Sequence, residues 1–298
     1  MQRVAASGTL GKIVYAEGEY NHPCAYDDIW FKQTYNFFSK HWRNYCSMTY
    51  YITHSLGPVM RATGATPKIV TAMGVYAPNR VDAPNASLSS GDIAAIITTM
   101  NDDDSVFRVT GCGGFGGHHN AYRLCGTKGQ IENIRGLGDK IMLRYNGWEK
   151  PEGVEEVSMY DPQWNDDDAD KIGASGHGGS DYLTARMFLE CIEEGHQPPH
   201  PFHVHSAVAM SSVAILAHRS MLEKGKPYEI PDFHTEEARK QYENDRHTVF
   251  IGADGTEPDL PACSHPDFRP TEKQMQMYLD LFGQNDEIFM NLHKAAKK

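Results

Sequence analysis

The chain has 298 residues, of which 40% are hydrophobic and 22% charged, with a formal net charge of −11. This length is enough for one large core or two modest ones, and the negative charge argues against binding to nucleic acid or to an anionic membrane. The sequence has no run of 18 apolar residues and no apolar signal-peptide core near its start, so we expect a cytoplasmic protein. Six scattered cysteines without a C-x-x-C pair are typical of free thiols.

The first half of the chain predicts mainly strands. The opening "RVAASGTLGKIV" is typical of the last turn of a helix, a glycine stop and a strand that continues over 11–20. Residues 21–49 predict an ordered loop with short helical pieces, and 50–63 predict a helix that stops at Gly64. Strand-like runs follow at 68–76, 92–100, 105–112, 119–125, 129–134 and 140–146.

The second half predicts mainly helices. The acidic segment 151–175 is expected to be irregular, helices are expected over 180–194 and 204–224, and 227–233 reads as a short closing strand. The polar tail 234–298 is expected to wrap the surface before a last helix near 271–282. Hairpin-connected strands followed by helices predict an α+β fold, with a large open, mostly antiparallel sheet and helices packed on one face.

The stretch "GCGGFGGHHN" matches the dinucleotide-binding pattern G-x-G-x-x-G through Gly111, Gly113 and Gly116. A true site of this kind lies between a strand and a helix, but here the following residues predict another strand. We therefore interpret the glycines as a strand end or bulge that approaches a neighbouring strand or subunit at the sheet edge. His118 and His119 are weaker candidates for ligand contacts.

The stretch "TYYITHSLGPVM" is the most specific candidate for chemistry. On a helix, Tyr50 and Tyr51 lie four and three residues before His54, so the three side chains would share one face. A Tyr–His cluster can transfer protons, because histidine titrates near neutral pH. A purely structural histidine on an amphipathic helix is the alternative.

The stretch "SGHGGSDY" is a glycine-rich loop that leads into a helix. Ser180 or Asp181 could cap that helix, which would hold His177 just ahead of its N-terminus, where backbone donors face a ligand. A tight loop without a ligand is the alternative reading.

Two further patterns do not predict metal sites. The histidines of "FHVHSAV", His203 and His205, open a helix, where residues two apart diverge, and no spacing supplies further zinc ligands. The runs "NDDD" and "NDDDAD" lack the spacing of a calcium loop.

Five stretches occur in an order that resembles the C-terminal domain of the glucose–fructose oxidoreductase / inositol dehydrogenase (Gfo/Idh/MocA) family, closest to its NAD-dependent glycosidase branch. They are "GTLGKIVYAEGEY", "YYITHSLGPVM", "RLCGTKGQIE", "GHGGSDY" and "MLEKGKPYEIPDF". The resemblance implies a family-like domain over 1–233, an extension over 234–298, and the absence of the N-terminal Rossmann domain. "EKP" at 149–151 spells the family's lysine motif but lies in a loop.

The resemblance also assigns roles to particular residues. His54 matches a helix histidine that contacts a sugar hydroxyl, Tyr51 matches the tyrosine of the glycosidase branch, and His177 matches a loop histidine near the sugar, so these three are the candidate catalytic residues. The candidate substrate-binding residues are Tyr50, Asp181 and Tyr182. His203 and Ser206 stand where relatives often have aspartates.

The implied function is a substrate-binding and oligomerisation domain of a sugar-active, NAD(P)-dependent oxidoreductase. NAD(P) is expected in a full-length relative, no cofactor is expected on this chain alone, and the open sheet face is expected to form a homo-oligomer. Two alternatives stay open: a subunit that completes its site with a separate Rossmann protein, and a cofactor-free carbohydrate-binding or lyase-like protein.

Overall fold

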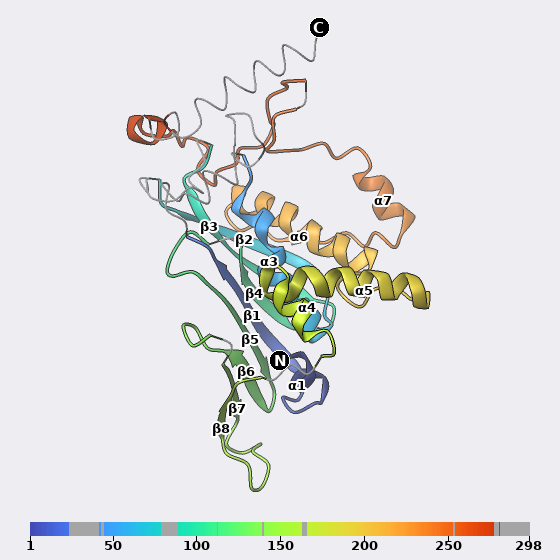
Figure 1. The fold of residues 1–298 in the computed structure, drawn as a ribbon. Coiled ribbons are helices and arrows are strands. Elements are labelled where there is room, and N and C mark those ends of the chain that lie inside the picture. Colours follow the sequence, from blue (N-terminus) through green and yellow to red (C-terminus); the bar gives the residue numbers. More distant parts are fainter. Residues whose placement is uncertain are drawn as a thin grey trace.

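A nine-stranded sheet forms the body of the described chain in the computed structural model (Figure 1). The structure describes residues 1–23, 42, 45–78, 89–111, 113–138, 140–162, 166–252, 254–276 and 280. Within these ranges, no helix has the length and apolar character needed to cross a membrane.

The strands of the sheet are β1 Ile13–Asn21, β2 Pro67–Tyr76, β3 Asp92–Asn101, β4 Val106–Thr110, β5 His119–Gly126, β6 Gly129–Asn133, β7 Ile141–Tyr145, β8 Val157–Tyr160 and β9 Tyr228–Glu229. The α-helices are α1 Gln2–Ala6, α3 Thr53–Thr63, α4 Ala169–Ala174, α5 Ser180–Glu194, α6 Val204–Leu222 and α7 Glu236–Tyr242, and the 3-10 turns are η2 Met48–Tyr51 and η3 His177–Gly179.

The strands lie in the order β8-β7-β6-β5-β1-β4-β3-β2-β9. Among these strands only β1 and β4 pair in parallel, and every other neighbouring pair is antiparallel. The predicted large, open and mostly antiparallel sheet is therefore confirmed. The strand β1 comes first in the chain yet lies at the centre, so its ends are close to residues from several later segments.

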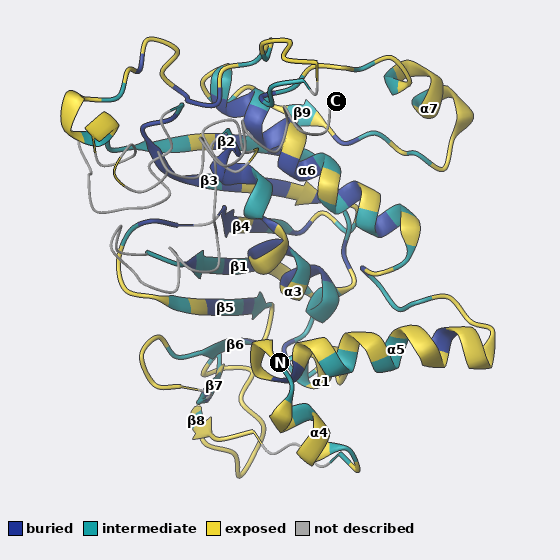
Figure 2. Ribbon diagram, turned by 45° about the horizontal axis from the view of Figure 1, so that its top comes forward, coloured by how far each residue is buried: buried dark blue, intermediate teal, exposed yellow. Residues whose placement is uncertain are grey.

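Helices α3 and α6 cover one face of the sheet and create the core (Figure 2). The core contains fully buried side chains from both helices and from the sheet. They are Leu56 and Met60 of α3, Val213 of α6, and Phe107 and Ile97 of the sheet. Burying each such side chain contributes about 1.5–3 kcal/mol, so this layer fixes α3 on the strands.

Helix α3 lies unusually close to β1 because Gly18 has no side chain. A Cβ added at Gly18 would lie only 2.1 Å from the carbonyl oxygen of Ser55 in α3. The Ser55 hydroxyl in turn donates a hydrogen bond to the carbonyl of Thr110 at the end of β4. The start of α3 is thus held over the ends of the two central strands.

The glycine-rich stretch at 111–117 makes room for protein backbone and side chain. A Cβ at Gly111 would lie 2.1 Å from the Met48 carbonyl oxygen, and one at Gly113 would lie 2.0 Å from Oδ1 of Asn21. Strand β5 follows the stretch, as expected, and no helix N-terminus is available to a phosphate there. The neighbouring strand was predicted correctly, but its position at the sheet edge was wrong, because β1 and β4 are central.

The structure also differs from the predicted elements in several places. The segment expected to be irregular contains β8 and α4, and the tail contains α7, whose N-terminus is capped by the Thr235 hydroxyl. The single helix expected over 50–63 is divided into η2 and α3. The loop predicted over 21–49 lies largely outside the described residues. The helix predicted near 271–282 is present over residues 272–276.

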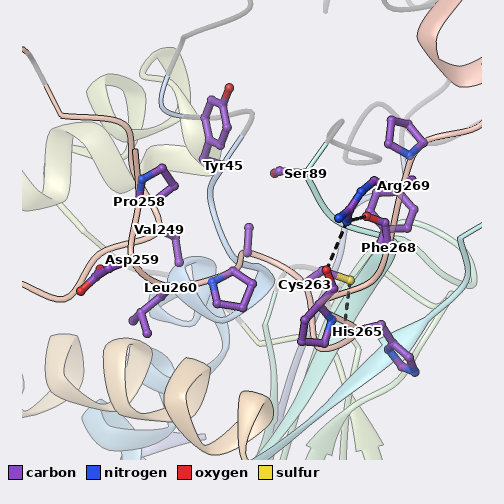
Figure 3. Close-up of a pocket in the computed structure, with 14 residues that line it drawn as sticks. Tyr45, Ser89, Val249, Pro258, Asp259, Leu260, Cys263, His265, Phe268 and Arg269 are labelled. Atoms are coloured by element: carbon purple, nitrogen blue, oxygen red, sulfur yellow. Dashed lines mark hydrogen bonds between the residues drawn. The ribbon is translucent and has the colours of Figure 1, made fainter. Parts of the chain in front are cut away.

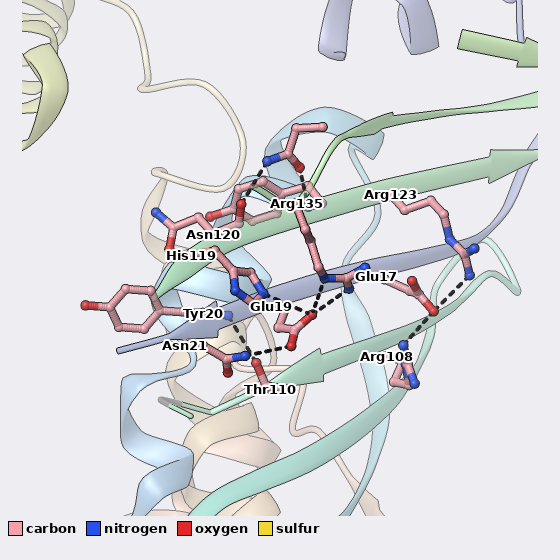
Figure 4. Close-up of polar contacts among 12 residues, drawn as sticks. Glu17, Glu19, Tyr20, Asn21, Arg108, Thr110, His119, Asn120, Arg123 and Arg135 are labelled. Atoms are coloured by element: carbon pink, nitrogen blue, oxygen red, sulfur yellow. Dashed lines mark hydrogen bonds and ion pairs between the residues drawn. The ribbon is translucent and has the colours of Figure 1, made fainter. Parts of the chain in front are cut away.

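The open face of the sheet is charged at its centre (Figure 4). Glu17 accepts from Arg108 at 2.7 Å and from Arg123 at 2.9 Å, and Glu19 accepts from Arg135. Exposed apolar side chains accompany these ion pairs, among them Met73 and Met100. The centre of the open face is therefore not apolar, because charged residues of β1, β4, β5 and the loop after β6 neutralise one another there.

The close approach of α3 to β1 predicts the effect of a single added methyl group. Gly18→Ala should destabilise the chain by about 1–3 kcal/mol or more, because the obstructing atoms belong to backbone and cannot rotate away. Urea unfolding followed by circular dichroism measures this change. Gly173→Ala is the matched control, since an added Cβ there meets no heavy atom within 4 Å; equal stability of the two variants would contradict the prediction.

Candidate functional site

His54 lies in the first turn of α3, over the end of β1. Its ring stacks on the ring of Tyr20, with centroids 4.5 Å apart. Its Nδ1 lies 3.3 Å from the hydroxyl of Thr53. His54 was predicted as a site residue and Tyr20 was not, although Tyr20 alternates along β1 onto the same face as Gly18, against which α3 packs.

A row of aromatic rings extends from His54 toward the glycine-rich stretch. Tyr20 lies 5.8 Å from the ring of His22, and His22 lies 4.7 Å from the ring of His118. His119 points elsewhere, toward Glu19 on the open face of the sheet, with 3.5 Å between its Nε2 and the carboxylate (Figure 4). The row thus brings α3, the end of β1 and residue 118 to one place.

Tyr122 of β5 contacts the backbone of His54. Its hydroxyl donates a 2.7 Å hydrogen bond to the backbone carbonyl of His54. Burial raises the pKa of Tyr122 to about 12, so the hydroxyl stays protonated and keeps donating at neutral pH. The only sequence signal for this contact is the alternation of β5, which puts Tyr122 on the helix-covered face.

The surroundings of His54 favour its neutral form. Burial of part of the ring lowers its pKa, and repulsion from His177 lowers the pKa further. A neutral imidazole carries one nitrogen that can accept a proton or a hydrogen bond. The influence of His177 also shows that the two predicted histidines lie within electrostatic reach of each other.

His177 begins the short turn η3 that leads into α5. Its φ of 54° and the positive φ angles of Gly178 and Gly179 fold the loop back on itself. Nδ1 of His177 lies 2.9 Å from the carboxylate of Asp181, one turn along, while the His177 side chain is 81% exposed. A neutral ring held in this way carries its proton on Nδ1 and leaves Nε2 as an acceptor facing solvent.

The predicted cap of α5 was wrong. The N-cap residue is Gly179, and no side chain there caps the helix. Ser180 donates instead to the backbone carbonyl of His177, and Asp181 contacts the His177 ring. Both residues therefore stabilise the loop that carries His177.

The two tyrosines before His54 point in different directions. Tyr51 lies 6.3 Å from His54, ring to ring, whereas Tyr50 packs against His218 and Phe250. The expectation that all three share one face was wrong for Tyr50, because both tyrosines belong to a 3-10 turn that ends before the α-helix starts. Burial raises the pKa of Tyr50 to about 12.

Tyr182 is engaged in a polar cluster that joins α5 to the segment before α4. Its hydroxyl donates to Asp168 at 2.8 Å, and Arg186 makes two hydrogen bonds to Asp166, at 2.8 and 2.9 Å. The contact that Tyr182 makes with Asp168 stabilises the fold. Its contact with a substrate stays a prediction.

The histidines of the H-x-H pattern diverge, as expected for the start of a helix. Nε2 of His203 lies 2.6 Å from the hydroxyl of Ser206, near His200, whereas His205 stacks on His234 with ring centroids 3.6 Å apart. The two rings point toward different partners, so they do not bind one metal ion together.

Comparison with known protein families identifies relatives over most of the chain. A family model described as "Glycosyl hydrolase 109, C-terminal domain" matches residues 1–240. A glycosyl hydrolase family 109 protein from Streptomyces niveus is 25% identical over 267 residues, which cover 80% of this chain and 50% of that protein. Glycosyl hydrolase family 109 protein 2 from Akkermansia muciniphila is 32% identical over 126 residues, covering 39% of this chain and 25% of that protein. The chain therefore spans half or less of the length of these relatives.

Solved structures share the fold at low sequence identity. Levoglucosan dehydrogenase in complex with NADH and levoglucosan aligns with a TM-score of 0.56 and 14% identity, over 77% of this chain and 62% of that one. An oxidoreductase from Agrobacterium radiobacter, in complex with NAD+, L-tartaric acid and magnesium, aligns with a TM-score of 0.52 and 15% identity, over 77% of this chain and 60% of that one. Similarity at this level of sequence identity shows that the chain shares the fold of these proteins.

The electrostatic contact between the two histidines predicts a measurable titration. The pKa of His54 should lie below 6.5, and His177→Ala should raise it part of the way back, because the repulsion disappears while the burial remains. Proton NMR of the histidine ring signals measures both values. His196, whose pKa is raised by its hydrogen bonds to the Gln197 carbonyl and Glu194, is the internal reference.

The same shift links His54 to stability. Since the folded chain binds this proton more weakly than the unfolded chain, the destabilisation from His54 should set in as the pH falls through 6.5 and be absent above it. A His54→Gln variant should lose this part of the pH dependence, and an unchanged profile would contradict the assignment.

Proposed function

Since this chain belongs to the glycosyl hydrolase 109 family, and carries the C-terminal domain of that family, we propose that it forms the sugar-binding half of a nicotinamide-dependent, sugar-active enzyme. The relatives are glycosyl hydrolase family 109 proteins, and the fold is that of the C-terminal domain of Gfo/Idh/MocA oxidoreductases. Levoglucosan dehydrogenase, solved with NADH and levoglucosan, shares this fold. The substrate we propose is a hexopyranose or hexopyranoside.

The observation that carries this proposal is the state of His54. Its ring lies on Tyr20 at the end of the central strand, its backbone is held by Tyr122, and burial keeps it neutral near pH 7. A neutral imidazole held rigidly at the surface suits acceptance of a proton from a sugar hydroxyl. The Tyr20 ring beside it offers a flat apolar surface of the kind on which a pyranose ring can rest.

We assign supporting roles to two predicted residues. His177 presents Nε2 toward solvent because Asp181 holds Nδ1, so it can accept a second hydroxyl of the sugar. Tyr51, with its ring 6.3 Å from that of His54, supplies a hydroxyl for the same region. Tyr50 packs inward, and we assign it to the core and not to the substrate.

We propose that the glycine-rich stretch of this chain does not hold a dinucleotide. Met48 and Asn21 occupy the space beside the glycines of the fingerprint, and a strand follows these glycines. A bound nicotinamide would supply hydride acceptance, and we propose that residues outside the described chain hold it. The contribution of this chain is to bind and orient the sugar and to take up its hydroxyl proton.

We also propose that copies of the chain associate through the open sheet face. The ion pairs of Glu17 and Glu19 are already satisfied within one chain, so another sheet could cover them without leaving an unpaired charge. The exposed side chains of Met73 and Met100 on this face supply apolar area for such a contact.

Saturation-transfer NMR with a panel of hexopyranosides tests the proposed function. We expect one class of sugar to bind the wild-type chain without a cofactor, and His54→Gln to weaken that binding about tenfold or more, the effect of one lost hydrogen bond to a sugar. His247→Gln is the matched control, an exposed histidine that pairs with Asp259 in the tail.

The outcomes separate the competing functions. Turnover of the bound sugar that starts only when a nucleotide-binding partner and NAD(P) are added supports the proposal. Cleavage of a glycoside by the chain alone would replace it with a cofactor-free lyase. Equal binding by wild type and His54→Gln would show that the site lies elsewhere.

A further inference from the structure

The tail returns to the sheet near the start of β3 and brings three metal-binding side chains together. Asp92 begins β3 and is 1% exposed, and Cys263, in the tail, is 2% exposed. His265 follows two residues later at the surface. One potential ligand atom from each of the three residues lies within 4.8 Å of the other two.

Two backbone N–H groups hold the sulfur of Cys263 in place. Its Sγ accepts backbone N–H groups from Gly91 and from His265, each at 3.4 Å, and the contact with His265 is drawn in Figure 3. The two contacts fix the direction of the sulfur, and the thiolate is the form of cysteine that binds metal ions.

The carboxylate of Asp92 is buried and held in one orientation. Its two oxygens accept hydrogen bonds from the backbone N–H and the hydroxyl of Ser264, both at 2.6 Å. A carboxylate has about four lone-pair positions, so two remain for a cation. Gly74 of β2 leaves space beside it, since a Cβ there would lie 2.8 Å from Asp92 Oδ1.

The His265 ring is also fixed. It stacks on the Tyr76 ring with centroids 3.7 Å apart, and its Nδ1 lies 3.0 Å from the Ser264 hydroxyl. Ser264 therefore connects His265 to Asp92 and orients both, as hydrogen-bonding groups around metal ligands commonly do.

We propose that Asp92, Cys263 and His265 bind one zinc ion, which fastens the tail to the start of β3. A mixed set of thiolate, imidazole and carboxylate is characteristic of zinc, whose tetrahedral geometry separates its ligand atoms by about 3.5 Å. The three side chains need to close in only slightly from their present spacing. A pocket of about 420 Å³ is lined by Cys263 and His265, so water can reach these two residues (Figure 3).

The site would explain how the tail stays attached beyond the conserved domain. Two of its three ligands lie outside residues 1–240, the part that matches the family model. An ion that joins residue 92 to residue 263 closes a long loop and binds only the folded chain, so its binding free energy adds to stability.

Cobalt substitution of the complete chain, stripped of metal with a chelator, tests the proposal. We expect one equivalent of Co²⁺ to bind, with a thiolate-to-cobalt charge-transfer band in the near ultraviolet and intense tetrahedral bands in the visible. Zn²⁺ should displace the Co²⁺ and bleach both. Cys263→Ser should abolish the charge-transfer band, whereas Cys191→Ser, which removes a buried thiol in α5, should retain it.

If Cys263→Ser does not fold, a second pair of variants tests the proposed zinc site. His265→Gln changes an exposed side chain and should weaken Co²⁺ binding about 100-fold or more, since even groups behind a ligand change metal affinity 10–100-fold. His247→Gln, an exposed histidine in the same tail, should bind Co²⁺ as wild type does. Absence of the charge-transfer band in the wild type, its survival in Cys263→Ser, or equal affinity in the two histidine variants would each overturn the proposal.

Discussion

The contact between the backbone of α3 and the backbone of β1 determines the rest of the candidate site. Gly18 allows the Ser55 carbonyl to come where any side chain would collide, and the Ser55 hydroxyl ties the helix to β4. Because α3 cannot tilt or slide against two central strands, its first turn has a fixed position. His54 is consequently placed on Tyr20 and above the hydroxyl of Tyr122, with no need for a ligand to arrange it.

Two histidines at this site are controlled by different physical effects. His54 is kept neutral mainly by loss of hydration against Tyr20, whereas the orientation of His177 comes from a carboxylate one helical turn away. Each ring thereby offers an acceptor nitrogen, and repulsion from His177 lowers the pKa of His54 further. Such a pair suits a substrate with several neighbouring hydroxyl groups, in which one proton is removed while the others are held as donors.

The sequence predicted the parts of this arrangement that depend on local pattern. Strand alternation located β1 to β7, and glycine stops located the ends of α3 and α5. Helical spacing could not place Tyr50, since a 3-10 turn and an α-helix direct side chains i and i+4 differently and their boundary depends on tertiary packing. Tyr20 and Tyr122 were not predicted as site residues for a related reason. Both contact His54 of another segment, and residue spacing within one segment does not reveal such contacts.

The glycines at 111 and 113 show why a motif needs its structural surroundings. A phosphate and a backbone carbonyl make the same demand on a glycine, namely the absence of a Cβ, so the residue pattern alone is compatible with either. The element that follows separates the two, because a helix presents unpaired N–H groups to an anion and a strand pairs them with its neighbours. Here the strand β5 follows, and Met48 and Asn21 occupy the space. A glycine pattern thus identifies a close approach, and the secondary structure beyond it decides what approaches.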